Sequence, residues 1–512
     1  MNAINDTTVG LSGVHTTDKP SIWNKFSVKN ITVAVLLFTF ILPKLLRVIQ
    51  RLCSPLQKVP GSFLHKITSW PMKISITKGE SHHFTVDLHN KYGPLVVLAP
   101  GVIAVSDANE IRRIIQTEDW PKSEAVYGNF RQDPDRPTLI AYTDKKAYSR
   151  RKRLISSMFG LRYIRSMQQS MRNCIAVLVK QLETQCRSNK GDPATVDIQH
   201  LIQSLAVDII GITTFGQSFN VVDTGSHPLP DQLKKALKLS GILQFMPWIR
   251  SIPFLPTRDP YVDSFTAAVI DNRRSLLQEG KVPPKDLLQK LVEASDDDEI
   301  TSEFRRSDIQ DESVILLAAG SETTANAQLF TLMMLMKHPE KMTKLYQEID
   351  SWYPANDTRP TDCEYSLSGM KYLQACIDEA MRLVPGQATG SPRQCPTEQN
   401  ILGYRIPEGT TVFPVTQQVH LDEAWWSHAT EYIPERWLET SEKERQYWPF
   451  SAGSRVCIGK HFALQEMHLT LVSLMRKFRF SYIPGQNEST HFRIAQQMSA
   501  SQYLMEVRLR EN

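Results

Sequence analysis

One cysteine lies in a sequence context that could give it a chemical role. Cys457 stands in the segment FSAGSRVCIG, with Gly453 and Gly459 on either side and Arg455 two residues before it. Glycine lets the backbone turn tightly and approach a neighbouring group closely. The pattern of residues 460–475 predicts a helix, so the cysteine is expected at a helix N-terminus. There the helix dipole and the free N–H groups favour a thiolate.

A thiolate in this position could act in three ways. It could be a nucleophile, a redox sensor or the axial ligand of a haem iron. A nucleophile needs a partner base, and the nearby His461 is not obviously placed for that role. A thiolate on haem iron pushes electron density to the metal and favours O–O cleavage. A buried cysteine that only packs is the fourth interpretation.

A second candidate lies in a long apolar segment. Residues 314–336 contain a single charged residue, Glu322. The length could span a bilayer, but several polar residues inside the segment would be costly in lipid. We therefore predict a helix through the core of a large domain. Its polar stretch, residues 319–324, indicates either a groove where a ligand contacts the helix and protons move, or a notch for helix packing.

The composition excludes several classes of protein. The 512 residues are 41% apolar and 22% charged, which excludes wholesale disorder and collagen. The net charge of +5 is too small to indicate a nucleic-acid binder. The seven cysteines are odd in number and none lies in a C-x-x-C pair, which argues against a disulfide scaffold or a structural zinc site. A reducing compartment is expected.

The N-terminal part predicts attachment to a membrane. Residues 1–30 form a polar tail, 31–49 form a single transmembrane helix, and 50–62 form a Pro-containing linker. Basic residues near the end of the helix can snorkel to the interface. The polar tail and the lack of a small-residue cleavage site argue against a signal peptide, and a helix lying on the surface is the other interpretation. The basic excess after the helix favours a cytosolic body.

The rest of the chain, residues 63–512, reads as one mostly helical body. Helical periodicity dominates, as in 163–187 and 364–384, and short β-type runs occur near 95–105 and 404–413. The predicted fold class is mainly α with small β-sheets (α+β).

The cysteine segment resembles the haem-binding signature F-x-x-G-x-R-x-C-x-G of the cytochrome P450 family, with every signature position matched. Residues 319–324 (AGSETT) resemble the oxygen-activation motif of the family's central helix. Residues 379–382 (EAMR) resemble its E-x-x-R motif, and 434–437 (PERW) its P-E-R-F/W motif. The resemblance covers nearly the whole chain and is closest to the membrane-bound eukaryotic class. It implies the cytochrome P450 fold around a buried haem, with one N-terminal transmembrane helix.

The resemblance also implies the cofactor and the residues that bind it. The cofactor would be haem b, iron protoporphyrin IX, with Cys457 as the axial ligand of the iron. The other implied haem contacts are Phe450, Gly453, Arg455, Gly459, Arg393, Tyr148 and Lys152. At Tyr148 and Lys152 the sequence departs from the family's usual Trp and Arg. Both can donate a hydrogen bond, but lysine lacks the planar fork of arginine.

Further roles follow from the same resemblance. Thr323 and Glu322 are the implied catalytic residues, since a hydroxyl and a carboxylate can relay protons. The threonine favours a monooxygenase over family members that rearrange peroxides. Glu379 and Arg382 share one helix face, and the resemblance implies a buried structural triad with Arg436.

The implied function is a monooxygenase that inserts one atom of O₂ into an apolar small molecule such as a steroid, terpenoid or other polycyclic lipid. Electrons would come from NADPH through NADPH-cytochrome P450 reductase, with cytochrome b5 as a further partner. The basic run 145–153 would receive the reductase. Membrane lipid is an expected partner and nucleic acid is not. The implied location is the endoplasmic reticulum membrane, single-pass, with a cytosolic catalytic domain.

Substrate contacts are expected from family position alone, at Leu316, Ala319, Ala388, Thr389 and Met498. Two alternatives stay open at this point. One is a haem-thiolate isomerase or dehydratase that acts without O₂, and the other is a membrane haem binder without enzymatic activity.

Overall fold

The computed structural model describes most of the chain between residues 38 and 510. The described ranges are 38–39, 42–131, 135–189, 191–229, 231–232, 235, 252, 259–296, 306–354, 357–361, 369–439, 446–493 and 495–510. The predicted tail 1–30 lies outside these ranges, and so do residues 31–37, 40 and 41 of the predicted transmembrane segment 31–49.

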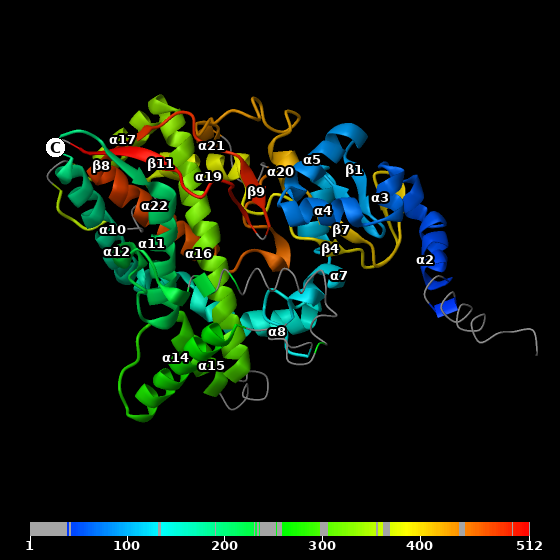
Figure 1. Ribbon diagram of the computed structural model, residues 1–512, viewed down its shortest axis with the longest axis horizontal. Helices are drawn as coiled ribbons and strands as arrows, with labels where there is room; N and C mark the ends of the chain where they lie inside the picture. Colours follow the sequence, from blue (N-terminus) through cyan, green and yellow to red (C-terminus); the bar gives the residue numbers. More distant parts are fainter. Residues whose placement is uncertain are drawn as a thin grey trace, which may run out of the picture.

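Helices make up the larger part of the described molecule (Figure 1). The long ones are α5 (Ser81–Tyr92), α8 (Lys145–Ser156), α10 (Gln168–Ser188), α11 (Ile198–Phe215), α14 (Pro260–Gln278), α15 (Leu287–Asp296), α16 (Arg306–Lys337), α17 (Pro339–Trp352), α19 (Lys371–Leu383) and α22 (Lys460–Lys477). The remaining helices are α2 (Leu42–Leu52), η3 (Pro55–Lys58), α3 (Phe63–Ile67), α4 (Trp70–Lys78), α6 (Ala108–Arg112), η4 (Arg113–Thr117), α7 (Glu124–Tyr127), η5 (Gly128–Phe130), η6 (Ser157–Phe159), α9 (Leu161–Ser166), α12 (Val221–Thr224), α20 (Thr416–His420), α21 (Arg436–Glu439) and η9 (Gly453–Arg455).

The β-structure consists of small sheets. A four-stranded sheet has the order β1-β2-β7-β4, built from Leu95–Ala99, Val102–Val105, Thr411–Pro414 and Arg393–Gln394. β2 and β7 are parallel and the other neighbours are antiparallel. A three-stranded sheet has the order β3-β11-β8 (Ala194–Asp197, Leu504–Leu509, Phe478–Tyr482). Two pairs complete the set, β5-β6 (Gln399–Ile401, Tyr404–Ile406) and β9-β10 (Thr490–Phe492, Gln496–Met498). The prediction of a mainly helical chain with small sheets is confirmed.

The central helix α16 is longer than the sequence indicated. It begins eight residues before Val314 and crosses the helical half of the molecule, beside α11 and in contact with α19 and α22 (Figure 1). Leu317, Ala325 and Leu329 on this helix are almost fully buried. The prediction of a core helix is therefore confirmed, because its apolar side chains are covered by other helices.

Among the described residues, one helix is long and apolar enough to cross a membrane. This helix is α11, Ile198–Phe215, and most of it is buried inside the molecule. Its apolar character is accounted for by its place beside α16 in the core.

The predicted linker 50–62 is packed against the body over its second half. Leu56 and Val59 are buried in the same apolar cluster as β1. The carbonyl of Pro60 accepts a hydrogen bond of 2.9 Å from the backbone N–H of Val97 in that strand. This part of the chain therefore belongs to the folded body.

Candidate active site

The cysteine loop connects η9 to the long helix α22. Cys457 lies three residues before Lys460, the first residue of that helix. The prediction that the cysteine lies at a helix N-terminus is therefore confirmed. Its backbone N–H donates to the carbonyl of Phe450 over 2.9 Å, and its own carbonyl accepts from the N–H of Lys460 over 3.4 Å. These two bonds hold the loop on both sides of the sulfur.

The surroundings of the Cys457 thiol differ from the expectation. Its side chain is exposed, yet protein surrounds it on enough sides that burial raises the pKa of the thiol. The backbone N–H of Gly459 and the charge of Lys152 act in the opposite direction and are outweighed. Lys152 is thus the nearby cation whose charge favours the thiolate. A bound metal cation deprotonates a coordinating thiol even where protein groups alone do not.

Arg455 in the cysteine loop and Arg393 from a distant part of the chain both have unused hydrogen-bond donors. Arg393 is fully buried and donates from Nη1 to the carbonyl of Trp120 over 3.3 Å. Arg455 donates to the carbonyls of Tyr142 and Thr143 over 2.7 and 3.1 Å. In the described part of the chain, Nε and Nη2 of Arg393 and Nε of Arg455 are buried without a partner.

Lys122 joins this cluster of buried cations. Its backbone pairs with Arg393 in an isolated bridge, and its ammonium group donates to the carbonyl of Ile140 over 2.8 Å. Burial lowers the pKa of Lys122 well below its usual value, and the charges of Arg455 and Arg393 lower it further. Burial also lowers the pKa of Arg455 to about 10.

The cluster fits an anionic ligand with carboxylate groups. Buried cations that repel one another and keep unused N–H groups are costly unless an anion compensates them. Arginine N–H groups are well suited to carboxylates. Arg393 and Arg455 therefore fit the two propionates of a haem beside Cys457. Lys122 was missed by the sequence analysis, because nothing in the sequence distinguishes it from an exposed lysine.

Tyr148 and Lys152 hold the cysteine loop from the side of α8. The Tyr148 hydroxyl and the Lys152 ammonium both donate to the carbonyl of Ser454, over 3.2 and 2.7 Å. The Arg455 guanidinium lies over the Tyr148 ring, 3.6 Å from its centroid. At these two positions, where the sequence departs from the family pattern, the side chains contact the loop itself.

The two glycines of the loop have different surroundings. Gly453 has a φ of +67°, and a Cβ there would lie 2.4 Å from the carbonyl oxygen of Ile115. Gly459 has an ordinary φ of −84°, and its Cβ would lie 3.9 Å from the Cys457 sulfur. Glycine is required at 453 by the left-handed backbone and by the close contact with η4.

We expect Gly453→Ala to destabilise the protein by about 2–4 kcal/mol, because it combines a left-handed backbone with an unrelievable contact to a carbonyl. Gly459→Ala is the matched control in the same loop and should cost roughly 1 kcal/mol or less. Urea unfolding of both variants measures the difference. Equal losses would show that the contact with Ile115 does not restrict residue 453.

The polar stretch of α16, residues 319–324, has one face packed against α11 and another that is accessible. A Cβ on Gly320 would lie 2.6 Å from Cδ1 of Ile210, so this glycine is a packing notch for α11. Ala319 and Thr323 are exposed on the same helix, and Leu316 is half-buried one turn before them. The Thr323 hydroxyl donates to the carbonyl of Ala319 over 2.7 Å. The stretch therefore provides both the packing notch and an accessible face with a hydroxyl group.

The other predicted substrate contacts do not share this accessibility. Ala388, Thr389 and Met498 are all buried, and Met498 belongs to the main apolar core. Glu322, beside Thr323, is half-buried and engaged in contacts of its own.

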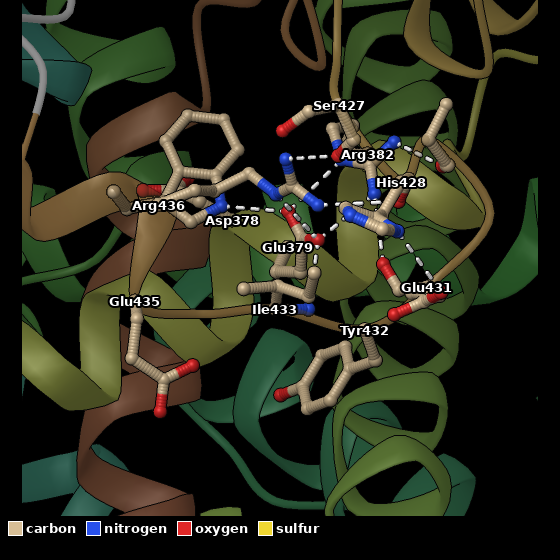
Figure 2. A network of polar contacts seen from close by, with 12 residues as sticks. Asp378, Glu379, Arg382, Ser427, His428, Glu431, Tyr432, Ile433, Glu435 and Arg436 are labelled. Atoms are coloured by element: carbon tan, nitrogen blue, oxygen red, sulfur yellow. Dashed lines mark hydrogen bonds and ion pairs between the residues drawn. The ribbon is translucent and has the colours of Figure 1, made fainter. Parts of the chain in front are cut away.

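The predicted triad is brought together in the structure (Figure 2). Glu379 accepts two hydrogen bonds from Arg382, of 2.9 and 2.8 Å, and one from Arg436, of 3.1 Å. Its carboxylate also accepts from the indole of Trp437 and the backbone N–H of Ile433, over 2.8 and 3.0 Å. Glu379 and Arg382 are fully buried, so five donors compensate one buried carboxylate.

Comparison with known proteins agrees with this architecture. A family model described as Cytochrome P450 matches residues 63–503. The cytochrome P450 monooxygenase acrD of Aspergillus aculeatus is 65% identical over 483 residues, covering 93% of this chain and 96% of that protein. The cytochrome P450 monooxygenase LUC2 of a Fusarium species is 61% identical over 487 residues, covering 94% and 95%. A crystal structure of a cytochrome P450 (CYP102L1) has a TM-score of 0.70 at 22% identity, covering 85% of this chain and 96% of that one, which shows the fold.

The mainly helical body with its small sheets has the fold of a cytochrome P450. The chain belongs to the cytochrome P450 family. It is a cytochrome P450 monooxygenase, an oxidoreductase whose family implies a haem iron cofactor.

Proposed function

We propose that the chain binds haem b through Cys457 and inserts one atom of O₂ into an apolar small molecule, using electrons that NADPH-cytochrome P450 reductase takes from NADPH. The observation that carries this proposal is the pair of buried arginines with unused N–H groups next to the cysteine loop. When bound, haem supplies the redox-active iron and the electron transfer that no side chain can provide.

The chain's own residues would bind, orient and transfer protons. Arg393 and Arg455 would hold the propionates, and Tyr148 and Lys152 would fix the loop through the Ser454 carbonyl. The Thr323 hydroxyl would pass protons to the reacting oxygen, with Glu322 next to it in sequence as the source.

The reductase is proposed to dock on α8. Lys145, Lys146, Arg150 and Arg153 are exposed on this helix, whereas Arg151 is buried and pairs with Glu312 over 3.0 Å. The docking face is therefore smaller than the basic run 145–153 predicted. Complementary charge of this kind mainly raises the association rate. Cytochrome b5 would be a second electron donor at the same membrane.

We propose a steroid, terpenoid or similar polycyclic lipid as the substrate, with Leu316, Ala319, Ala388, Thr389 and Met498 as its contacts. A mixture of apolar side chains and one or two hydroxyls suits such a molecule. We propose the endoplasmic reticulum membrane as the location, with residues 31–49 as the anchor and the body in the cytosol.

The test combines a spectrum with a turnover assay. The reduced, CO-bound spectrum reports the thiolate ligand, and NADPH consumption with reductase and a substrate panel of steroids, terpenes and fatty acids reports monooxygenation. Product formation without NADPH or O₂ would instead indicate the isomerase or dehydratase. Haem binding without turnover of any substrate in the panel would indicate the second alternative, a membrane haem binder without enzymatic activity.

Thr323→Ala tests the proton relay. We expect the share of consumed NADPH that appears as product to fall roughly 10-fold, because general acid–base groups contribute about 10²–10⁴-fold and water replaces part of the effect. Hydrogen peroxide release should rise in proportion. Thr323→Ser keeps the hydroxyl and should restore coupling.

Thr331→Ala is the matched control on the same helix. The Thr331 hydroxyl also donates to the carbonyl four residues before it, over 2.7 Å, but the side chain is buried. Coupling should stay unchanged in this variant. Unchanged coupling in Thr323→Ala would contradict the relay.

A further inference from the structure

A cavity of about 290 Å³ lies where the N-terminal helix joins the body. It is bounded by α2, η3, α3 and the turn between β1 and β2, far along the chain from the cysteine loop. Arg47, Arg51 and Lys66 line it, so three cations from two helices share one cavity.

The whole segment around this cavity is basic. Residues 42–78 contain seven lysines and arginines and no aspartate or glutamate. Since the whole chain has a net charge of +5, the remainder sums to 5 − 7 = −2. The positive charge of this protein is therefore concentrated in the segment that joins the predicted anchor to the body.

Two of the three cations, Arg51 and Lys66, are held by carbonyl groups and keep further N–H donors for a ligand. Arg51 donates from Nη1 to the carbonyl of Ile67 over 2.6 Å. Lys66 donates to the carbonyl of Gln57 over 2.7 Å, and burial lowers the pKa of its ammonium group. Within the described residues, no ion pair is recorded for Arg47, Arg51 or Lys66. Clustered cations of this kind suit a phosphate, which arginine can bind in a bidentate manner.

Large apolar side chains are exposed on two of the helices that bound the cavity, α2 and α3, and on the neighbouring helix α4. Leu46 and Ile49 on α2, Phe63 on α3 and Trp70 on α4 are all exposed, and Trp70 reaches 69%. Figure 1 shows α2, α3 and α4 at one end of the molecule. Tryptophan and aliphatic side chains beside lysine and arginine are typical of surfaces that contact the interface of a bilayer.

We propose that this cavity, formed around Arg47, Arg51 and Lys66, binds the headgroup phosphate of an anionic phospholipid. The choice of a lipid over free phosphate rests on the exposed apolar side chains and on the proposed membrane anchor. The acyl chains would extend over the apolar side chains of α2 and α3. The site would give the body a preferred lipid and a fixed contact with the membrane, in addition to the anchor.

Short-chain lipids test the proposal on the full-length holoenzyme in neutral detergent. Calorimetric titration compares dihexanoyl phosphatidate, dihexanoyl phosphatidylcholine and inorganic phosphate. We expect phosphatidate to bind roughly 10-fold or more tightly than either of the others, because it alone offers both an accessible phosphate and acyl chains. Equal affinity for phosphatidylcholine would overturn the proposal. Equal affinity for inorganic phosphate would show a phosphate site that does not recognise lipid.

Two double variants distinguish lipid binding in the cavity from non-specific electrostatic attraction of the lipid to the basic segment. Arg47→Gln with Lys66→Gln removes two cations from the cavity and should weaken phosphatidate binding by roughly 10- to 30-fold. Lys44→Gln with Lys73→Gln removes the same charge from α2 and α4 outside the cavity and should change it less than about 3-fold. Equal losses in the two variants would mean that the charge attracts lipid without a site.

This experiment does not depend on the proposed reaction or on a membrane-spanning anchor. The titration needs neither turnover nor a bilayer, and the reduced, CO-bound spectrum of each variant checks that the protein is folded. A failed titration with an active enzyme would therefore reject the lipid site alone.

Discussion

Cys457→Ala protein, produced with porphyrin supplementation, is expected to fold but to contain no bound haem. The loss should exceed the roughly 10- to 100-fold drop in metal affinity that follows from removing a group that supports a metal ligand. The other groups near the loop, Arg393 and Arg455, would contact the propionates and could not replace the bond to iron. The ratio of haem to protein and the reduced, CO-bound spectrum measure the effect.

Cys53→Ala is the control for this experiment. Cys53 is also a free and exposed cysteine, but it directly follows α2 and lies outside the cysteine loop. It should retain full haem content and an unchanged spectrum. Haem retained by Cys457→Ala with the same spectrum would reject this cysteine as the iron ligand, and with it the proposed chemistry.

Glu379→Gln should destabilise the protein by about 3–5 kcal/mol, because it leaves the buried charge of Arg382 without its counterion. The carboxylate also holds Arg436, Trp437 and the backbone of Ile433. Its loss therefore loosens the connection between α19 and the segment that leads to α21. Urea unfolding followed by far-UV circular dichroism measures the change.

The same substitution at an exposed pair is the control. Glu398 pairs with Arg405 over 2.7 Å, and both side chains are more than half exposed. Glu398→Gln should cost less than about 1 kcal/mol. If Glu379→Gln does not fold, Arg436→Gln at the edge of the triad gives a milder measurement. A Glu379→Gln protein as stable as Glu398→Gln would contradict the structural role.

Local patterns in the sequence predicted the elements of the fold more reliably than the contacts between them. The periodic segment 364–384 contains α19, and the β-type run 95–105 contains β1 and β2. The spacing of Glu379 and Arg382 placed both on one helix face, which is a local property. The backbone N–H of Ile433 completes the same network from a distant segment, and nothing in the sequence around Ile433 indicates this contact.

Buried charges were the hardest feature to predict, because burial depends on tertiary contacts. Lys122 looks like a surface lysine until its backbone is seen to pair with that of Arg393. Arg151 lies in a basic run that reads as exposed, yet it is buried against Glu312 at the start of α16. The contact between residue 453 and the carbonyl of Ile115, which requires glycine there, joins segments more than 300 residues apart and could not be predicted from the local sequence.

The buried residues of the linker have a consequence for protein engineering. Leu56 and Val59 fill the apolar cluster beneath β1, and Pro60 caps an N–H group of that strand. A shortened protein that begins after Gly61 would expose this apolar cluster to solvent and should aggregate more readily. One that begins before Ser54 would keep the cluster buried. If the N-terminal segment is replaced by that of another protein, the junction should therefore lie within α2, before Pro55.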